Sequence, residues 1–488
     1  MSPAQIFEKI QALPLDKQTE VLDLIEFLAS RSPVPSDRKT TTDDWSKAEF
    51  SQMPNYQRKL MKTARYIPQL RFPEFQDMGD WQEVQLQKIA VITNEKAGNN
   101  KFKLMSITSG VGLVSQLEKF GRQIAGAAHK NYFVIHKNYF AYNKSATKDF
   151  PEGFIALYSG EEPAAVPNSI FVCFKVCEEK VIPQYLQYLF LRNLHGKWLR
   201  KYLTIGARVH GSLNVDNKDL LALPIPLPSD KLSLIEQKKI ADCLASIDDR
   251  ITIEIQKLEV LKNHKKGLIH KLFPANGQTL PLTRFPEFQN SDEWKVTSLG
   301  EVSKITSGGT PNRSKKKYWN GNIPWITTSL INFNIIYKAD EFISEDGLKG
   351  SSAKLFPADT ILIAMYGQGK TRGKVAILGT QATTNQACAA IILDETLDTK
   401  FLFHNLAGRY DEIRKLSNSG GQENLSTGLI KQILISYPAD KSEQQKISKC
   451  FTSLDKLINL QTKKIDTLKL HRNGLMQQLF PAVSENSR

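Results

Sequence analysis

The sequence predicts an α+β protein made of two α/β lobes in tandem, each followed by a long coiled-coil helix. Three observations lead to this prediction. Two pairs of similar segments recur in the same order along the chain, and heptad-spaced apolar residues follow each lobe. Within the lobes, short apolar runs alternate with turn-forming residues, as expected for strands. A chain of 488 residues is long enough for several domains.

The duplication is visible in two matched pairs of segments. PQLRFPEFQDMGDW begins at Pro68, and PLTRFPEFQNSDEW begins 213 positions later, at Pro281. EQKKIADCLASIDD begins at Glu236, and EQQKISKCFTSLDK begins 207 positions later, at Glu443. Between these pairs, residues 95–210 and 308–420 share almost no visible identity. We therefore expect a common scaffold that carries two diverged recognition lobes; the alternative is a drifted duplication with no recognition role.

Composition indicates a globular protein with a polyanionic partner. The net charge is +15, and 41% of the residues are hydrophobic. The sequence has no long apolar run, and its first residues contain Glu8 and Lys9, so we expect a cytoplasmic protein with no membrane span and no secretion signal. The cysteines are scattered without zinc-ligand spacing, so we expect reduced thiols and no metal site.

The chain divides into segments in a definite order. Residues 1–31 carry apolar residues at helical spacing, and residues 32–66 form a polar linker. We expect a tethered helical hairpin there; a regulatory or second interaction role is the alternative. The first lobe is expected over 67–228, with its helix over 229–275. The second lobe is expected over 276–438 and its helix over 439–482, which leaves a short tail at 483–488.

Both long segments carry apolar residues at positions a and d of a heptad. The two segments share their polar interruptions, Glu254 with Gln461 and Lys265 with Arg472, and such residues set register and partner choice. The helices most simply pack on each other, and antiparallel packing would place the lobes at opposite ends. Packing of each helix on a separate partner is the alternative, and the pattern does not decide between them. The predicted helix-packing residues are Ile240, Leu244, Ile247, Ile251, Leu258, Leu261, Leu268, Ile447, Phe451, Leu454, Ile458, Ile465, Leu468 and Leu475.

Polar and basic loops separate the predicted strands, and we expect them to bind DNA. Lysine and arginine neutralise phosphates, whereas arginine, glutamine and asparagine can contact base edges. For any single residue, a solvated loop is an equal alternative. The candidates in the first lobe are Tyr142, Asn143, Lys144, Lys148, Arg208 and Asn214. Those in the second lobe are Arg313, Lys316, Lys317, Tyr318, Trp319, Gln368, Lys370, Thr371, Arg372, Lys374, Asn385, Gln386, Gln422 and Asn424.

Catalytic motifs are missing from the sequence. The segment from Ala364 to Thr371 has alanine where a phosphate-binding loop needs glycine. Glu178 and Lys180 have a nuclease-like spacing that is common by chance, and His210 has no paired carboxylate or nucleophile. We therefore expect a binding protein without catalytic residues or a cofactor of its own. The alternatives are a restriction endonuclease with its own cleavage centre and a coiled-coil scaffold that does not bind DNA.

The order lobe, helix, lobe, helix resembles the specificity subunit of Type I restriction-modification systems. So do GGTP at 308–311, YWNGNIPWITT at 318–328, GQGKTRGKVAIL at 367–378, TTNQACAA at 383–390 and the helix starts EQKKIA and EQQKIS. The resemblance covers about residues 68–482. Residues 1–31 depart from it and look like a segment of small antitoxin-like bacterial proteins.

The resemblance implies two target-recognition domains, each of which reads half of a bipartite double-stranded DNA target, with antiparallel helices that space them. It also implies two modification subunits that dock on the helices and carry S-adenosylmethionine. Restriction subunits, which use ATP and Mg, would join that complex to cleave DNA. In this interpretation all cofactors lie in the partner subunits and none in this chain.

Overall fold

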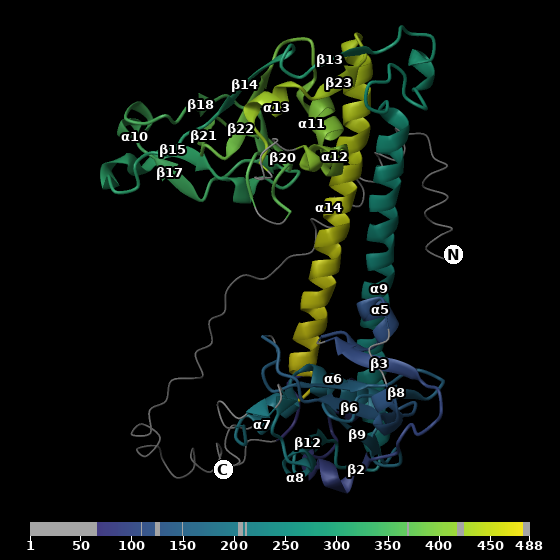
Figure 1. The fold of residues 1–488 in the computed structure, drawn as a ribbon. Coiled ribbons are helices and arrows are strands. Elements are labelled where there is room, and N and C mark those ends of the chain that lie inside the picture. The colour runs from purple at the N-terminus through teal and green to yellow at the C-terminus, as the bar shows by residue number, and fades with distance from the viewer. Residues whose placement is uncertain are drawn as a thin grey trace. The chain divides into compact units, whose positions relative to one another are not determined.

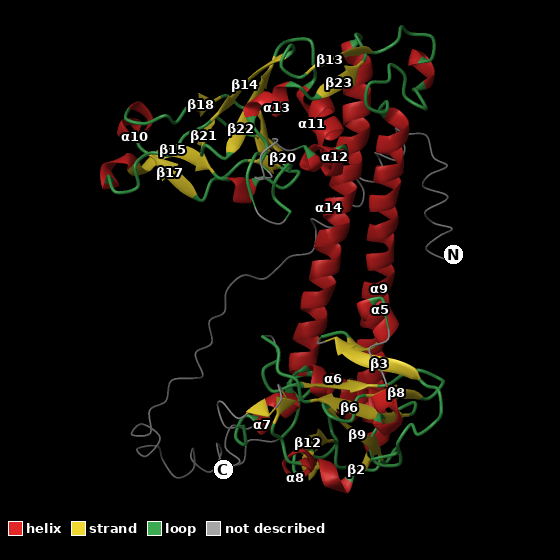
Figure 2. Cartoon of the chain, in the orientation of Figure 1, coloured by secondary structure: helices red, strands yellow, loops and turns green. Residues whose placement is uncertain are grey.

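The computed structural model describes residues 66–481 except 109, 123–126, 149, 204–207, 210–211, 368–369 and 417–423 (Figures 1 and 2). The hairpin predicted for residues 1–31 and the linker up to residue 65 lie outside the described residues. So do the candidates Gln368 and Gln422, and also His210. Within the described part of the chain, no helix is both long enough and apolar enough to cross a bilayer.

Lobe 1, the part of the described chain ahead of the first long helix, is a mixture of short strands and short helices. Its helices are α5 (Gln116–Phe120), α6 (Pro183–Leu191), α7 (Leu194–Leu199) and α8 (Asn217–Leu221), with 3-10 turns at Pro73–Phe75, Leu86–Lys88 and Ala127–Asn131. Its strands are β1 (Gln82–Gln85), β2 (Ala90–Thr93), β3 (Lys103–Thr108), β4 (Gly112–Ser115), β5 (Phe133–Ile135), β6 (Phe140–Asn143), β7 (Phe154–Leu157), β8 (Ala164–Val166), β9 (Phe171–Val176), β10 (Arg208–Val209), β11 (Ser212–Leu213) and β12 (Pro224–Leu227).

Lobe 2, which lies between the two long helices in the chain, has the same kind of composition. Its helices are α10 (Glu345–Lys349), α11 (Thr399–Gly408), α12 (Tyr410–Lys415) and α13 (Thr427–Lys431), with 3-10 turns at Pro286–Phe288, Lys316–Tyr318 and Thr328–Leu330. Its strands are β13 (Lys295–Ser298), β14 (Ser303–Ser307), β15 (Trp319–Ile326), β16 (Ile335–Ile336), β17 (Glu341–Ile343), β18 (Leu355–Phe356), β19 (Ile361–Ala364), β20 (Val375–Leu378), β21 (Ala382–Thr384), β22 (Cys388–Leu393) and β23 (Leu434–Tyr437).

The two lobes share one sheet topology although their sequences have little visible identity. The order β2-β9-β6-β7 in lobe 1 corresponds to β14-β22-β19-β20 in lobe 2, where β16 adds one edge strand. The order β4-β3-β8-β5 corresponds to β17-β15-β21-β18, and both sheets contain one parallel pair, β3 with β8 and β15 with β21. An antiparallel ladder, β1 with β12 or β13 with β23, completes each lobe. The duplication therefore extends through the diverged regions.

The core of each lobe includes a pair of neighbouring strands that is fully buried. Every residue of β6 and β7 is buried, and so is every residue of β19 and β20. Strands that are covered on both faces consist of almost continuous apolar runs, as these do. The repeated tryptophans Trp81 and Trp294 are also buried, and Trp294 packs at 5.7 Å from the ring of Phe401.

The long helices α9 (Ser233–Leu272) and α14 (Lys441–Gln478) have 40 and 38 residues and lie side by side (Figure 1). At 1.5 Å per residue they are roughly 60 and 57 Å long. The contacts Asp248–Arg472, Glu254–Gln461 and Lys265–Asp455 run in opposite directions along the two helices, which makes the pair antiparallel. The helices therefore pack on each other within one chain, which the heptad pattern left undecided. All fourteen predicted packing residues are buried or half-buried.

Each long helix begins against its own lobe and ends on the other lobe. Phe273, just after α9, stacks on Phe451 of α14 and lies 5.3 Å from Phe401 of lobe 2. Phe480, just after α14, lies 5.3 Å from Tyr185 of lobe 1. Phe451 belongs to the lobe 2 core, so the first heptads of α14 pack on that lobe as well as on α9. The apolar residues at the heptad positions thus contact both the other long helix and the lobes.

Candidate nucleic-acid interface

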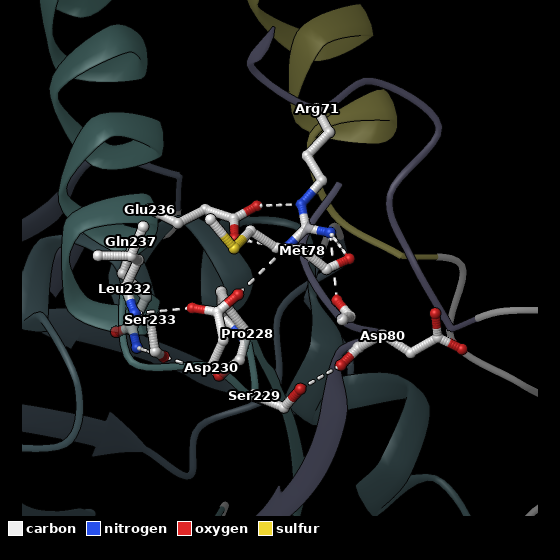
Figure 3. A network of polar contacts seen from close by, with 11 residues as sticks. Arg71, Met78, Asp80, Pro228, Ser229, Asp230, Leu232, Ser233, Glu236 and Gln237 are labelled. Carbon is white, nitrogen blue, oxygen red and sulfur yellow. Dashed lines mark hydrogen bonds and ion pairs between the residues drawn. The ribbon is translucent and has the colours of Figure 1, made fainter. Parts of the chain in front are cut away.

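The identical motif RFPEFQ of the two repeats fastens each lobe to a helix. In lobe 1, Arg71 donates from Nε and Nη2 to the carboxylate of Glu236, at 2.7 and 2.8 Å (Figure 3). Arg71 also donates from Nη1 to the carbonyls of Met78 and Gly79, at 3.1 and 3.2 Å. The hydrogen bond that it donates to Glu236 raises the pKa of this guanidinium. A bidentate pair buried in this way holds one geometry, because the planar guanidinium matches the carboxylate.

Lobe 2 repeats this joint at equivalent positions. Arg284 donates to the carboxylate of Glu443 at 2.9 and 2.6 Å, and to the carbonyls of Ser291 and Asp292. Lys239 pairs with Glu74 in lobe 1, and Lys446 pairs with Glu287 in lobe 2. The matched sequence segments are therefore structural joints. Residues that read a ligand must be sought elsewhere in the lobes.

Glu236 and Glu443, which pair with the two arginines, are each followed by a glutamine. The side chain of that glutamine hydrogen-bonds to a loop of the same lobe. The side-chain oxygen of Gln237 accepts from the backbone N–H of Ile182 at 2.9 Å, just before α6. The side-chain oxygen of Gln444 accepts from the backbone N–H of Asp398 at 2.7 Å, just before α11. Both glutamines are fully buried. These contacts fix the helix pair α6–α7 or α11–α12 relative to the long helix.

Two predicted DNA loops of lobe 2 contact each other. The hydroxyl of Thr310 donates to the side-chain oxygen of Gln386, which joins the loop after β14 to the loop after β21. The guanidinium of Arg313 pairs with Glu341 and lies 3.8 Å from the centre of the Trp319 ring. This stacking orients one cation at the surface of the lobe.

The loop after β19, described for residues 365–367 and 370–374, contacts the loop after β21. The backbone N–H of Met365 donates to the carbonyl of Ala387 at 2.9 Å. Further along, the ammonium group of Lys374 donates to the side chain of Asn332 at 2.7 Å. The loop after β21 therefore contacts both the loop after β14 and the loop after β19. This brings predicted candidates from three separate segments together.

Lobe 1 brings two of its predicted segments together in a similar way. The connection from β6 to β7 occupies the same place in the topology as the connection from β19 to β20. The backbone N–H of Leu213 in β11 donates to the carbonyl of Lys144 at 2.8 Å. Asn214 follows β11 and is exposed, as is Lys148 in the loop. Lys144, Lys148 and Asn214 thus belong to one surface region of lobe 1.

Comparison with known proteins decides the family. The family described as "Type I restriction modification DNA specificity domain" matches residues 78–263 and 291–470, which together make up most of the chain. The chain belongs to this specificity-domain family. The matched ranges fall one on each half of the duplication. This confirms the prediction of two target-recognition lobes that are each followed by a long helix.

Individual relatives agree with this assignment. The specificity subunit of a Type I restriction enzyme from Escherichia coli is 29% identical over 50% of this chain and 58% of its own length. A Type I specificity subunit from Methanocaldococcus jannaschii is 29% identical over 38% of this chain and 44% of its own length. The chain thus spans about half the length of these curated relatives. A Type I S subunit from M. genitalium has a similar fold, with a TM-score of 0.53 and 17% identity over 86% of this chain and all of that one.

Four of the predicted DNA contacts in this specificity-domain chain are buried. Tyr142 lies in β6 at the centre of its sheet, and its hydroxyl donates to the carbonyl of Glu152 at 2.8 Å. Burial also raises the pKa of this phenol. The neighbouring Asn143 is buried too, and its side chain accepts from the backbone N–H of Ser145. Tyr142 and Asn143 are therefore core residues, and their prediction as DNA contacts is corrected. An aromatic-rich segment has the same appearance in sequence whether it lies in a core or on a surface.

Tyr318 and Arg372 are also buried, with 8% of each residue exposed. Neither is retained as a direct DNA contact. Exposed candidates are Lys148, Asn214, Arg313, Lys316, Lys317, Lys370 and Gln386, and half-buried candidates are Lys144, Trp319, Thr371, Lys374, Asn385 and Asn424. Arg208 lies in β10, but its side chain is outside the described residues, as are Gln368 and Gln422.

Sequence reasoning missed the residues that support these loops. Tyr410 and Arg414 of α12 contact the 365–374 loop, and Arg200 at the end of α7 contacts the 144–153 loop. They lie tens of residues from the loops in sequence, and no motif marks them. Only the tertiary structure brings them to the candidate interface.

No grouping of residues resembles a cleavage centre in the described part of the family member. The carboxylate of Glu178 accepts from Asn138, whereas the ammonium of Lys180 donates to the carbonyl of Lys88, so the two side chains have separate partners. The described residues include no cluster of histidine, cysteine or acidic side chains able to hold a metal ion. Burial lowers the pKa of His195 to about 4 and that of His404 to about 3, which keeps both imidazoles neutral near pH 7.

Proposed function

We propose that this chain is the DNA specificity subunit of a Type I restriction-modification complex. Lobe 1, assigned to residues 67–228, reads one half of a bipartite double-stranded DNA target, and lobe 2, assigned to residues 276–438, reads the other half. The helices at 229–275 and 439–482 set the separation of the two lobes. One observation carries the proposal: two lobes of one topology, with different loop residues, share a single antiparallel helix pair.

The adjoining loops of lobe 2 support a role in reading DNA. Exposed cations at Lys316, Lys317 and Lys370 can neutralise phosphates, and the amide of Gln386 can contact base edges. Glycines at 308 and 309 allow close packing of the loops, because a side chain at either position would collide with neighbouring backbone. Phosphate contacts require affinity to fall steeply as salt increases.

The chemistry of the complex belongs to partner subunits in this proposal. Two modification subunits dock on the long helices and bring S-adenosylmethionine, and restriction subunits bring ATP and Mg. The assembly acts in the cytoplasm. Support comes from the family match and from the names of the relatives, which are specificity subunits of Type I enzymes. The buried, neutral histidines and the separate partners of Glu178 and Lys180 agree with a chain that binds without reacting.

Mapping methylated positions in a host genome tests the proposal. Strains that express the chain with its modification subunits are expected to methylate one split sequence with two defined halves. Replacing residues 295–430 with the corresponding lobe of another specificity subunit should change one half only. A change in both halves, or in neither, would contradict the assignment of one half-site to each lobe.

A restriction endonuclease with its own cleavage centre makes a different prediction. The purified chain alone would then cut specific DNA in the presence of a divalent cation, and substitution of Glu178 or Lys180 would abolish cutting. Cleavage by the chain alone would overturn the specificity-subunit proposal. A scaffold that does not bind DNA would show no salt-sensitive association with duplex DNA.

A further inference from the structure

We infer that a short helix beside each reading loop holds that loop in the conformation that recognises bases, through Glu152 and Arg200 in lobe 1 and through Tyr410 in lobe 2. The inference rests on the proposed function, and it names positioning residues for it. The loop residues concerned are the described ones, 144–148 and 150–153 in lobe 1 and 365–367 and 370–374 in lobe 2, and the helices are α7 and α12. None of the matched sequence motifs includes these supporting residues.

Glu152 anchors the loop of lobe 1 at its last residues. Its carboxylate is 3% exposed and accepts from Nε of Arg200 at 2.7 Å, from Nη2 of Arg200, and from the amide of Asn193 at 3.4 Å. Burial opposes ionisation of this carboxyl, but the hydrogen bonds from Arg200 and Asn193 outweigh burial and lower its pKa. A buried carboxylate without these partners would be strongly destabilising. The loop end is therefore coupled to the helix that supplies them.

The backbone around α7 is shaped to receive this loop end. Asn193 takes a left-handed conformation with φ of 59°, and Gly196 leaves room for its amide, because a side chain at 196 would collide with it. Gly153 has φ of 83°, and its carbonyl faces Nε2 of His195 at 3.2 Å. These features together allow residues 152–153 to pack against α7.

Lobe 2 supports the equivalent loop from the equivalent helix with different chemistry. The hydroxyl of Tyr410 donates to the carbonyl of Lys370 at 2.6 Å and accepts from Nη1 of Arg414 at 3.0 Å. The ring of Tyr410 meets the ring of Phe333 edge to face at 5.3 Å. Gly373 has φ of 84° and packs on the backbone of Arg414. The position of the support is retained in both lobes although its residues are not.

Both loops are also fixed at their first residues. The carbonyl of Lys144 accepts from the backbone N–H of Leu213, and the carbonyl of Met365 accepts from that of Leu425. Loop residues that such contacts already hold lose less conformational entropy when the complex forms, which lowers the cost of binding. Contacts to bases depend on this order much more than contacts to phosphates do, because bases must be met at defined positions. Loss of the support should therefore reduce selectivity more than non-specific affinity.

Substitutions in the full chain, purified with its modification subunits, test the inference. The probes are a duplex that carries the split site mapped by methylation, two duplexes with one half scrambled, and an unrelated duplex. Arg200→Gln removes the bonds to Glu152, and Arg200→Lys keeps the charge and one bond. Lys197→Gln is the matched control, since it removes one exposed positive charge from the same helix. Thermal unfolding of each variant checks that the chain folds.

We expect Arg200→Gln to reduce selectivity for the lobe 1 half about tenfold, with partial recovery in Arg200→Lys. Selectivity for the other half should stay unchanged. The salt dependence of non-specific binding should be the same in Arg200→Gln as in Lys197→Gln. Tyr410→Phe, which keeps the ring but removes the hydroxyl, should reduce selectivity for the lobe 2 half alone.

Three results would overturn the inference: equal behaviour of Arg200→Gln and Lys197→Gln, loss of selectivity in both halves together, or a salt slope lowered by about one with selectivity retained. The last result would make Arg200 a plain phosphate contact. Absence of sequence selectivity in the unmodified chain would instead count against the proposed function. The two failures are therefore distinguishable.

Discussion

Gln461 of α14 donates its side-chain N–H to both the carboxylate and the backbone carbonyl of Glu254 in α9, at 2.7 and 2.8 Å. These two residues occupy equivalent positions in the duplicated helix. A residue that contacts its own repeat equivalent marks the local twofold axis of the antiparallel pair. Lys257 and Lys464, which are also equivalent, both approach the carboxylate of Glu254.

The first prediction exchanges this central pair. Glu254 is buried, and although burial opposes its ionisation, the Gln461 amide and the Lys464 and Lys257 ammonium groups lower its pKa to about 2. Gln461→Glu would place two carboxylates together and should destabilise the chain by roughly 1–3 kcal/mol. The double exchange E254Q/Q461E should recover most of that loss, because the equivalent lysines can serve a carboxylate at either position. Urea unfolding measures both effects.

Gln256→Glu, a change of the same kind at an exposed position of α9, is the control for this exchange. Its effect on the free energy of unfolding should be small. No recovery in the double exchange would mean that the surroundings of the pair are not equivalent in the two helices.

The second prediction concerns the flanking ion pairs. Asp248 binds Arg472 at 2.6 Å and accepts from the hydroxyl of Tyr188 at 2.9 Å, while Asp455 binds Lys265 at 2.5 Å. These side chains are partly exposed, so each pair should contribute only roughly 0.5–1.5 kcal/mol to the free energy of unfolding. A double-mutant cycle of Asp248→Asn with Arg472→Gln should give a coupling energy of that size. A coupling energy near zero would show that the pair does not contribute to helix register.

The third prediction concerns acid stability. Burial lowers the folded-state pKa of His195 to about 4 and that of His404 to about 3, whereas unfolded histidine titrates near 6.5. The stability that follows from this difference is complete above pH 6.5 and is lost as the pH falls toward 4, because the unfolded chain binds the proton first. Protonation linked to each histidine should lower the free energy of unfolding by roughly 1–3 kcal/mol by pH 4.5.

Thermal unfolding between pH 7 and 4.5 measures this loss. His404→Gln should flatten the pH dependence, although it lowers stability at pH 7 through lost packing. His264→Gln, at an exposed position of α9, should leave the slope unaltered. If stability fell with pH equally in the His404 variant and in the unmodified chain, His404 would not be the source of the acid sensitivity.

The fourth prediction separates the two lobe joints. Arg71→Lys keeps the charge but loses the bidentate geometry with Glu236, and should weaken the lobe 1 joint by roughly 1–3 kcal/mol. Hydrogen exchange should then increase around β1 and β12 and stay unaltered around β13 and β23. Arg284→Lys is the matched variant and should give the reverse pattern. Faster exchange in both lobes from either variant would show that the joints are not independent.

The features that recur in the sequence were the predictable ones. The repeated segments and heptads predicted the two lobes and the long helices, because both signals are local or periodic. The common topology of the lobes was not visible, since equivalent strands such as β6 and β19 retain burial but not residue identity. The antiparallel direction, which the family resemblance implied, is confirmed by contacts such as Lys265–Asp455. The heptad pattern alone could not show it, because these contacts join positions 190 apart in the chain.

The exposure of the candidate DNA-binding residues was predicted only in part, for a physical reason. Lys148 and Gln386 are exposed, but Tyr142 and Tyr318 are buried, and a polar aromatic residue suits both environments. The supporting residue Tyr410 gave no signal, because its contact with Lys370 depends on how α12 packs. Candidate contacts on loops therefore need tertiary structure before they can be ranked.

In the described chain, each long helix is attached to both lobes, one at each of its ends. The backbone N–H of Leu70 bonds to the carbonyl of Gln478, and that of Thr283 bonds to the carbonyl of Lys271, so each lobe holds the start of one helix and the end of the other. If one helix slid along the other by a heptad, roughly 10 Å, the contacts of both lobes with the helix ends would break together. If the proposed function holds, the spacing of the two half-sites is resistant to thermal slippage, and a change in that spacing requires a change in helix length.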